Sequence, residues 1–279
     1  MPEVRILRRV ASLQPSITVT LRDLGLLRYL AACTKYCIEL CPELKKAGIA
    51  VVEDSWSANT EQILSARPDL VMASVPYRME SLAEIMKAGV PCLCLAPKTL
   101  SDVFLDVLHI ARIMGAEHRG VALVTRMEEE IGRVRRMTSA LPRPRTYCEE
   151  WGKPLIHSQP WVAELVRAAG GEFVGEPGKQ VNEEQIAVAD PEVVIAAWCG
   201  AGDRVPLEKL AARRGWRQTV AVREARVYCI RDEFLNTPAS TLLQGLHALC
   251  AAIHPEVFGD VAGLKRLASA EIAQHAREA

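Results

Sequence analysis

The stretch NTEQILSARPDLV, residues 59–71, returns 123 positions later as NEEQIAVADPEVV, residues 182–194, with seven of the thirteen positions identical. In each copy a helical pattern stops before a proline, Pro68 or Pro191, and an apolar run typical of a buried strand follows. Proline cannot continue a helix, and it pushes the residue before it out of the helical region. The repeat therefore predicts one helix, stop and strand unit in each of two related halves of the chain.

Short apolar runs alternate with helical segments along most of the chain, which is the pattern of an α/β protein with mainly parallel sheets. We expect strands near residues 9–13, 49–52, 70–73, 92–95, 145–149, 193–197 and 226–230.

A helical stretch, residues 100–141, separates the two sets of strands. Gly115 and Ala116 interrupt it, which leaves residues 117–140 as one helix of about 24 residues, roughly 36 Å long. The apolar positions of this helix form a single stripe. The sequence thus predicts an N-terminal α/β lobe over residues 1–98, a helical segment with a rigid interlobe helix over residues 99–141, and a C-terminal α/β lobe with terminal helices over residues 142–279.

The composition excludes several classes of protein. The 279 residues include 34 basic and 34 acidic side chains, so the chain lacks the net positive field that nucleic-acid binding usually needs. No apolar run is long enough to cross a membrane. The N-terminus shows no secretory signal, and the nine cysteines suit free thiols, so the sequence as it stands predicts a cytosolic protein. Removal of a leader would leave the same sequence, and the location would then be the periplasm or the cell surface.

Bulky aromatic residues follow the predicted strands. Four of the five tryptophans lie at or just after strand ends, although aromatic residues make up only 5% of the chain. In parallel α/β sheets ligands bind at the carboxyl ends of the strands. The tryptophans therefore favour a cleft for a flat or bulky ligand, while the alternative is that they plug the ends of the lobes.

The segment CTKYCIELC places Cys33, Cys37 and Cys41 on one face if it is helical. Thiolates favour zinc, copper(I) or iron–sulfur clusters, and His157 would be a fourth ligand or the axial ligand of a chelated metal. No pair of cysteines has the CxxC spacing, however, so the alternative is three small residues lining a pocket or surface. The motifs GxxxxGK[ST], GxGxxG, GxSxG and HExxH are absent, so no enzyme signature appears.

Five segments together resemble the class III substrate-binding proteins, which serve importers of cobalamin and iron-siderophores. In order these are VASLQPS, DSWSANTEQILSARPDLVMAS, EEWGKPLIHSQPWVAELVRAAGG, NEEQIAVADPEVVIAAW and ARVYCIRDEFLNTPASTLLQGLHAL. The resemblance runs from about residue 10 to about residue 253, and the third segment looks most like the cobalamin-binding branch. It implies a protein without enzymatic activity, with two α/β lobes bridged by a rigid helix and a ligand cleft between them.

The resemblance also implies functional residues by position. The ligand cleft would be lined by Gln14, Pro15, Ser16, Trp56, Tyr77, Trp151, His157, Trp161, Trp198 and Phe234. Relatives that dock to a permease present one glutamate per lobe to its arginines, and Glu61 and Glu184 match those positions. The alternative for these two residues is an ordinary exposed glutamate in the first turn of a helix.

Two functions remain open from the sequence. The first is binding of a corrinoid or a ferric chelate, with no required cofactor, either as the small-molecule receptor of an ABC importer permease or as a cytosolic relative. The second is a cytosolic metal-site protein or enzyme that holds zinc or an iron–sulfur cluster on Cys33, Cys37 and Cys41. Neither function involves nucleic acid or insertion into a membrane.

Overall fold

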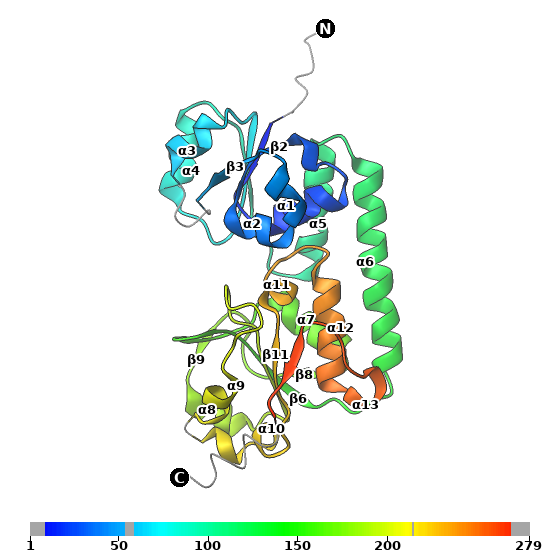
Figure 1. Cartoon of the computed structure of the whole chain (residues 1–279). Helices are drawn as coiled ribbons and strands as arrows, with labels where there is room; N and C mark the ends of the chain where they lie inside the picture. Colours follow the sequence, from blue (N-terminus) through cyan, green and yellow to red (C-terminus); the bar gives the residue numbers. More distant parts are fainter. Residues whose placement is uncertain (1–8, 54–58, 214, 269–279) are drawn as a thin grey trace. The chain divides into compact units, whose positions relative to one another are not determined.

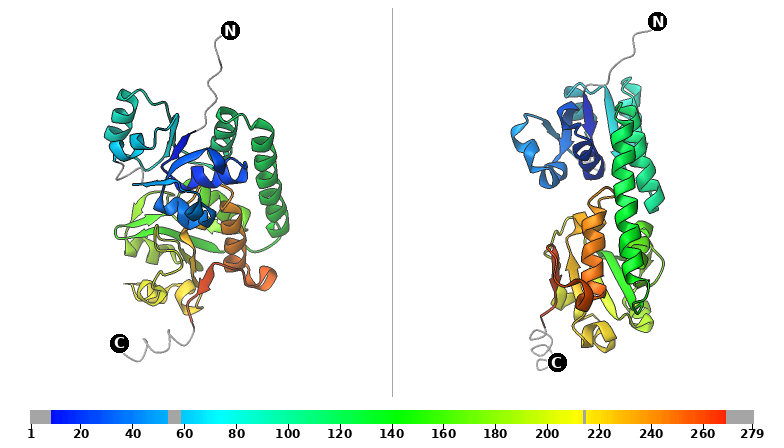
Figure 2. Two further views of the ribbon diagram at one scale, coloured as in Figure 1. Left: turned by 45° about the horizontal axis from the view of Figure 1, so that its top comes forward. Right: turned by 90° about the vertical axis from the view of Figure 1, so that its right-hand side faces the viewer.

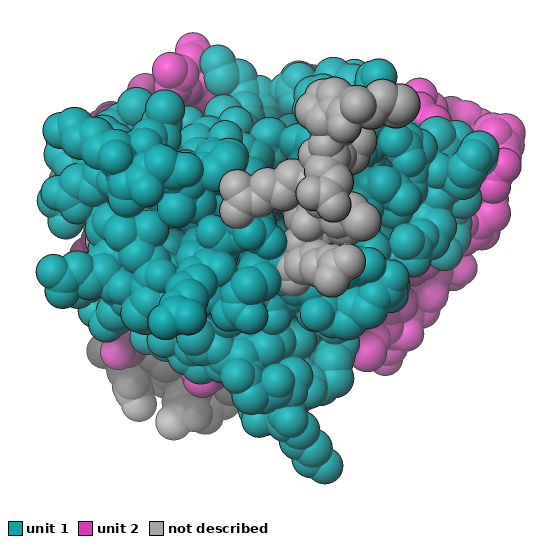
Figure 3. Space-filling view, turned by 90° about the horizontal axis from the view of Figure 1, so that it is seen from above, with its two compact units in different colours: residues 1–126, 238–240 teal, residues 127–237, 241–279 magenta. Residues whose placement is uncertain are grey.

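The computed structural model describes residues 9–53, 59–213 and 215–268 of the chain (Figure 1). It divides into two compact units, which Figure 3 colours separately. Unit 1 comprises residues 1–126 and 238–240, and unit 2 comprises residues 127–237 and 241–279. Each unit has its own sheet covered by helices, which confirms the α/β class predicted from the sequence.

Unit 1 is built on a five-stranded parallel sheet with the strand order β3-β2-β1-β4-β5. The strands are β1 (Val10–Ser12), β2 (Leu30–Thr34), β3 (Ala50–Val52), β4 (Leu70–Ser74) and β5 (Cys92–Leu95). The α-helices are α1 (Pro15–Asp23), α2 (Lys35–Leu40), α3 (Thr60–Ser65), α4 (Met79–Lys87) and α5 (Leu100–Ile113), and the 3-10 helices are η1 (Leu27–Tyr29) and η2 (Pro42–Lys46). The central strands β1 and β4 are buried throughout, and their apolar side chains form the core of this unit.

Strand β2 was not predicted, and its presence changes the interpretation of the cysteine segment. Cys33 belongs to β2, Cys37 lies in α2, and Cys41 follows the end of α2. The boundary falls at Thr34, whose hydroxyl accepts a hydrogen bond from the N–H of Cys37 at 3.3 Å and so caps the helix. The three cysteines therefore do not share one helix face.

The long helix α6 (Glu117–Thr138) is one continuous green helix in Figure 2. Its residues up to 126 belong to unit 1 and the following ones to unit 2. Gly115, at φ 64°, separates it from α5, as the sequence predicted. The middle of its apolar stripe is buried from Val124 to Val134, whereas Val121 and Met137 at the two ends are exposed.

Unit 2 has a seven-stranded mixed sheet with the order β12-β11-β10-β6-β7-β9, and β8 pairs with β6. The strands are β6 (Arg145–Gly152), β7 (Leu155–His157), β8 (Glu172–Phe173), β9 (Gln180–Val181), β10 (Val193–Ala196), β11 (Val227–Ile230) and β12 (Leu264–Arg266). The α-helices are α7 (Pro160–Ala168), α8 (Glu183–Ala189), α9 (Leu207–Ala211), α10 (Val220–Arg223), α11 (Asp232–Leu235), α12 (Leu242–Ile253) and α13 (Pro255–Phe258), with the 3-10 helix η3 (Trp216–Gln218). The predicted strands β6, β10 and β11 pair in parallel, while the unpredicted β7, β9 and β12 are short and antiparallel.

The repeated sequence forms α3 with β4 in unit 1 and α8 with β10 in unit 2. Each of these strands pairs in parallel with the first strand of its own unit, β1 or β6. The repeated asparagine caps the helix in both copies: Asn59 Oδ1 accepts from Gln62 N–H at 3.2 Å, and Asn182 Oδ1 accepts from Gln185 N–H at 2.9 Å. The shared residues are thus explained by helix capping and by a common place in the sheet.

The helices of the two copies, α3 and α8, also end in the same way. Arg67 (φ 48°) and Asp190 (φ 45°) follow the helices in the left-handed region, immediately before the two repeated prolines. An arginine at the start of each unit's first strand reaches this helix end, with Arg9 Nη2 donating to Ala66 O at 2.5 Å and Arg145 Nη2 donating to Asp190 O at 2.7 Å. These arginines satisfy helix carbonyl groups that would otherwise lack a partner.

Candidate functional site

The candidate site of unit 2 lies at the carboxyl ends of β6, β10 and β11, the edge at which open α/β sheets bind ligands. The backbone keeps two of these ends together beyond the regular strands. Ala197 N–H donates to Glu149 O at 2.9 Å, and Cys199 N–H donates to Glu150 O at 3.1 Å. This edge presents three partly or largely exposed aromatic side chains, Trp151, Trp198 and Phe234.

A fully buried carboxylate, Glu149, lies at the centre of this edge. Its Oε2 accepts hydrogen bonds from the Tyr147 hydroxyl at 2.8 Å and from Arg213 Nη1 at 2.6 Å. Its Oε1 accepts from Trp198 Nε1 at 2.8 Å and from Arg213 Nη2 at 2.9 Å. A buried charge without such partners is strongly destabilising, so four donors and one opposite charge explain how the core accommodates this group. Burial and the neighbouring Glu149 raise the pKa of Tyr147, which keeps its hydroxyl a donor.

Trp198 follows β10 and is held on several sides. Its indole N–H is bound to Glu149, and the Arg213 guanidinium lies 5.9 Å from its ring centroid. The benzene edge of the indole lies against Gly152, where a Cβ atom would stand only 2.6 Å from the ring. Part of the ring remains exposed at the strand ends.

A second carboxylate, Glu150, belongs to a polar group beside Trp198. Gln159 Nε2 donates to its Oε2 at 2.7 Å, and the Cys199 thiol lies 3.7 Å from its Oε1. Burial raises the pKa of Glu150, and burial together with Glu150 raises the pKa of the Cys199 thiol. Asn236 donates through Nδ2 to Ala197 O at 2.7 Å, while its buried Oδ1 has no hydrogen-bond partner among the described residues.

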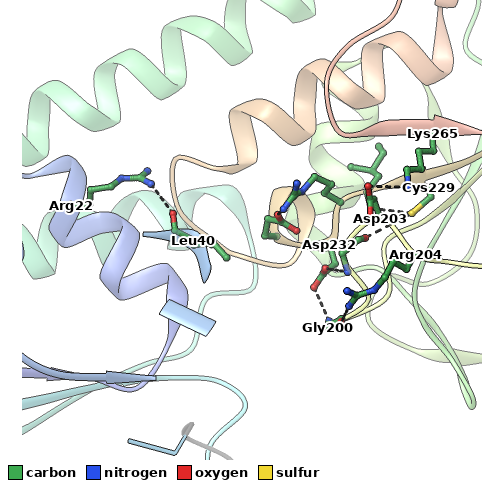
Figure 4. Close-up of polar contacts among 12 residues, drawn as sticks. Arg22, Leu40, Gly200, Asp203, Arg204, Cys229, Asp232 and Lys265 are labelled. Atoms are coloured by element: carbon green, nitrogen blue, oxygen red, sulfur yellow. Dashed lines mark hydrogen bonds and ion pairs between the residues drawn. The ribbon is translucent and has the colours of Figure 1, made fainter. Parts of the chain in front are cut away.

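The loop after β10 is held by Asp232, the first residue of α11. Its two carboxylate oxygens accept from Gly200 N–H at 2.8 Å and from Gly202 N–H at 2.7 Å (Figure 4). Both glycines have positive φ values, 77° and 60°, a conformation that side chains disfavour. Burial raises the pKa of Asp232. The carboxylate thus fixes the path of the loop that carries Trp198.

Phe234 reaches the site on the short helix α11. Two glycines leave room for it: a Cβ at Gly245 would stand 2.2 Å from Phe234 O, and a Cβ at Gly263 would stand 2.4 Å from the Phe234 ring. Trp161 supports the same helix by donating from Nε1 to Leu235 O at 2.8 Å.

Two of the residues expected to line the site are buried in unit 2. Trp161 is 5% exposed and His157 is 3% exposed. The His157 ring meets Tyr147 edge-on at 5.4 Å between centroids, and its Nδ1 donates to Lys179 O at 3.0 Å. Burial lowers the pKa of His157, which favours the neutral imidazole, and its 3% exposure places the ring in the core of unit 2. The burial of Trp161 agrees with the alternative interpretation, in which the tryptophans plug the ends of the lobes.

In unit 1, Gln14, Pro15 and Ser16 start helix α1 directly after β1, as the sequence predicted. Gln14 Nε2 donates to Pro76 O at 3.3 Å, which joins the end of β1 to the segment that carries the half-buried Tyr77. Ser16 is 8% exposed. Trp56 lies outside the described residues.

The predicted metal ligands Cys33, Cys37 and Cys41 are all buried and free of disulfides. Cys33 and Cys37 are hydrogen-bonded neighbours, and bonds from Cys33 and nearby threonine hydroxyls lower the pKa of Cys37 to about 6 despite its burial. Within residues 9–53, 59–213 and 215–268, no group of three histidine, cysteine or acidic side chains is placed to hold a metal ion. The strand boundary at Thr34 also removes the common helix face on which the metal hypothesis depended.

Glu61 and Glu184 are exposed in the first turns of α3 and α8, each next to the capping asparagine. Their positions in the two units correspond, as the repeat predicted.

A hollow of about 530 Å³ opens at the opposite edge of the unit 2 sheet, before β6, β10 and β11. Three arginines line it, Arg143, Arg226 and Arg266, and each donates to main-chain carbonyl groups. Three glutamates in its wall balance their charge. The hollow lacks the exposed aromatic rings of the strand ends, so we place the candidate site at the strand ends.

Sequence comparison adds to this geometry. The sequence pattern described as "Periplasmic binding protein" matches residues 10–234, most of the chain. The chain belongs to the periplasmic binding protein family. Two similar proteins are an uncharacterized ABC transporter substrate-binding lipoprotein, YvrC, of Bacillus subtilis and a vitamin B12-binding protein of Pectobacterium carotovorum. The first is 23% identical over 90% of this chain and 81% of its own, and the second is 24% identical over 88% of each.

A solved structure agrees in fold. The periplasmic heme-binding protein of Pseudomonas aeruginosa superposes with a TM-score of 0.79 at 20% identity, over 95% of this chain and 96% of its own. At that identity the likeness concerns the fold alone. Together with the family, it confirms the class III resemblance.

This binding protein is therefore a substrate-binding component of the ABC-importer type and not an enzyme, as the sequence predicted. Among its relatives, one is named as a lipoprotein and one as a periplasmic protein. Among the helices that the structure describes, none has the length and apolar character needed to span a bilayer.

The central polar group of the binding protein was only partly visible in the sequence. Tyr147 and Glu149 alternate along β6 and so face the same side, a signal that strand periodicity offers. Arg213 comes from the segment after α9, 64 positions from Glu149, and no local pattern connects the two.

Proposed function

We propose that this binding protein captures a corrinoid, or a comparable flat metal chelate, at the strand-end surface of unit 2 and delivers it to an ABC permease. The observation that carries the proposal is the set of three aromatic side chains around polar groups at this edge, Trp151, Trp198 and Phe234. Aromatic rings supply contact area, and polar groups fix the orientation of the ligand. The name of the relative that binds vitamin B12 supports the same ligand class.

Several of the residues expected from the sequence have a role in this proposal. Trp151 is 43% exposed, and its Nε1 is bound to Lys153 O at 2.8 Å, so it offers its ring faces. Amide groups on the corrin edge would meet Gln159 and Asn236, whose Oδ1 lacks a partner within the described chain. From unit 1 we propose Gln14, Pro15, Ser16 and Tyr77 as further ligand contacts. His157 and Trp161 act from the core, by supporting the strand ends.

Titration calorimetry with cyanocobalamin, cobinamide and hemin tests the ligand. We expect saturable binding of a corrinoid and a loss of roughly tenfold or more in affinity for Trp151→Ala. Phe258→Ala, a half-buried aromatic on α13 away from the strand ends, is the matched control and should bind like the unaltered protein. If only hemin bound, the ligand would be a flat chelate other than a corrinoid. If none of the three bound, the proposal would be refuted.

We also propose that Glu61 and Glu184 dock the protein to the permease. Their support is the repeat itself, which places one exposed glutamate at the same point of each unit. Such a pair suits a partner that presents the same cationic group twice. In uptake of labelled corrinoid by source cells, Glu61→Lys and Glu184→Lys should each reduce transport while ligand binding stays unchanged. Glu43→Lys, an exposed glutamate outside the repeat, is the control, and equal transport by all three variants would disprove docking.

The relatives' names support a further proposal, that the protein works outside the cytoplasm. Fractionation of cells that naturally produce the protein, followed by detection with an antibody against it, tests this. Recovery in the cytosolic fraction alone would contradict the proposal.

A further inference from the structure

The indole N–H of Trp198 is already occupied. It donates to Glu149 Oε1 at 2.8 Å, and indole nitrogen has only this one hydrogen to give. Whatever contacts the exposed part of Trp198 therefore meets carbon atoms of the ring and no hydrogen-bond donor.

The acceptor that holds this N–H is itself fixed. Glu149 is 0% exposed, and Arg213 binds both of its oxygens, at 2.6 Å and 2.9 Å. A two-point pair of this kind restricts rotation of the carboxylate as well as its position. The side chain of Arg213 is only 10% exposed, so water competes little for the pair.

Arg213 in turn lies over two tryptophan rings. Its guanidinium carbon lies 4.9 Å from the Trp216 ring centroid and 5.9 Å from that of Trp198. Trp216 is fully buried, and its Nε1 donates to Glu183 O at 3.0 Å, so it forms a fixed floor for the arginine. The planar guanidinium binds both oxygens of Glu149 while it lies over the rings, and the ammonium group of a lysine could not do both.

We propose that Glu149 and Arg213 are positioning residues that fix the Trp198 indole, so that Trp198 recognises the ligand through ring area alone. The inference deepens the proposed function and rests on it, since it assumes that a flat ligand packs at the strand ends of unit 2. Neither residue touches the ligand; both act through Trp198.

The first test needs no ligand. In protein labelled with ¹⁵N-tryptophan, the indole signal of Trp198 is identified by its loss in Trp198→Phe. Arg213→Lys and Glu149→Gln should each speed exchange of this N–H with solvent by about tenfold or more, because its acceptor is no longer fixed. The Trp161 N–H, bound to Leu235 O, is the internal reference and should not change.

Tyr147→Phe is the matched control for this test. It removes a buried hydrogen bond from the same carboxylate, 2.8 Å long, without touching Trp198 or Arg213. We expect it to leave the Trp198 N–H protected. Unchanged exchange in Arg213→Lys, in a protein that melts as a folded chain, would overturn the positioning role. If Glu149→Gln does not fold, Arg213→Lys still decides the question.

The second test measures affinity for the corrinoid bound by the unaltered protein. Trp198→Phe keeps an aromatic ring and should bind within about threefold, whereas Trp198→Ala and Arg213→Lys should each lose about tenfold. Equal losses for Trp198→Phe and Trp198→Ala would show that the N–H matters, against the inference. If the unaltered protein binds none of the chelates, the proposed function fails, and the exchange experiment still decides whether Glu149 and Arg213 position Trp198.

Discussion

The two units are built alike at one end of their sheets and differently at the other. At the amino ends, Arg9 and Arg145 cap equivalent helices and left-handed residues precede the repeated prolines. At the carboxyl ends, β1 stops after three residues and α1 follows at once, whereas β6 runs for eight residues and turns back as β7 before α7 begins.

The helices that follow show where the difference was introduced. Helices α1 and α7 are both nine residues long, and each starts with a Gln-Pro pair, Gln14 or Gln159 being the residue before the helix. The arginines of the two units are 136 positions apart and these glutamines 145 apart, so unit 2 has nine additional residues between the arginine at its first strand and the glutamine before its helix. That addition carries Trp151 and Gly152 and lengthens β6 past Glu149. The comparison teaches that the two units share the amino ends of their sheets, while the additional residues of unit 2 contribute Trp151 and Gly152 to the aromatic site.

The largest expected effect is a loss of stability when the buried polar group at the strand ends of unit 2 is removed. Glu149→Ala leaves the largely buried Arg213 with only the more distant Glu183 carboxylate, 3.9 Å away, and we expect it to reduce the free energy of unfolding by about 3–5 kcal/mol. In unit 1, Ser12 is the buried polar group at the end of β1, where it accepts from the Thr18 hydroxyl at 2.8 Å. Ser12→Ala should cost only about 1 kcal/mol.

Urea denaturation of the two variants measures this difference. Trp151→Ala, an exposed change at the same edge, is the control and should unfold like the unaltered protein. If Glu149→Ala and Ser12→Ala reduced the free energy of unfolding by similar amounts, the strand ends of the two units would not differ in their contribution to stability.

A smaller expected effect is a pH dependence of stability that comes from His157 in unit 2. Burial lowers the pKa of His157, so the folded state keeps it neutral while the unfolded state takes up a proton below about pH 6.5. Stability should therefore fall as the pH drops below that value, by up to about 1.4 kcal/mol per pH unit, until the folded pKa is reached. Thermal melts between pH 7 and 5 should show a shallower slope for His157→Gln.

The exposed His109 of unit 1 supplies the control for the pH dependence. His109→Gln should leave the slope as it is. A slope that does not respond to His157→Gln would assign the pH dependence to other groups, such as His254, whose pKa is also lowered by burial.

The smallest effect tests the shared amino ends. Arg67 and Asp190 have the same left-handed backbone, in which glycine is less strained, so Arg67→Gly should stabilise the protein by about 0.5–1 kcal/mol. Asp190→Gly should bring no gain, because Asp190 Oδ1 accepts from Val220 N–H at 2.9 Å and Oδ2 pairs with Arg145 at 3.3 Å. Equal stabilisation by both changes, measured by calorimetry, would mean that these side-chain bonds contribute little.

The repeated helix and strand units could be predicted from the sequence because they depend on local signals. Capping asparagines, prolines and apolar runs placed α3, β4, α8 and β10. Strand β2 was missed because its small residues, LAACT, lack the β-branched pattern of a strand. The strands β7, β9 and β12 are two or three residues long, and their pairing with distant partners decides their conformation.

The site was harder to predict because position along the chain does not give the direction of a side chain. His157 and Trp161 come after the predicted strand at residues 145–149, as Trp151 does, yet they are buried in the core. Arg213 was missed because its contacts with Glu149 and Trp216 form only after the whole unit has folded.

The close contact between Gly152 and the Trp198 ring should also constrain how these two positions change during evolution. A Cβ atom at this position would stand 2.6 Å from the Trp198 ring, so the glycine is needed for space, since its φ is not in the left-handed region. Neither residue can then change freely while the other stays. In an alignment of descendants of this branch, a larger residue at the first position should be accompanied by a smaller one at the second, and the two substitutions should appear together on the tree.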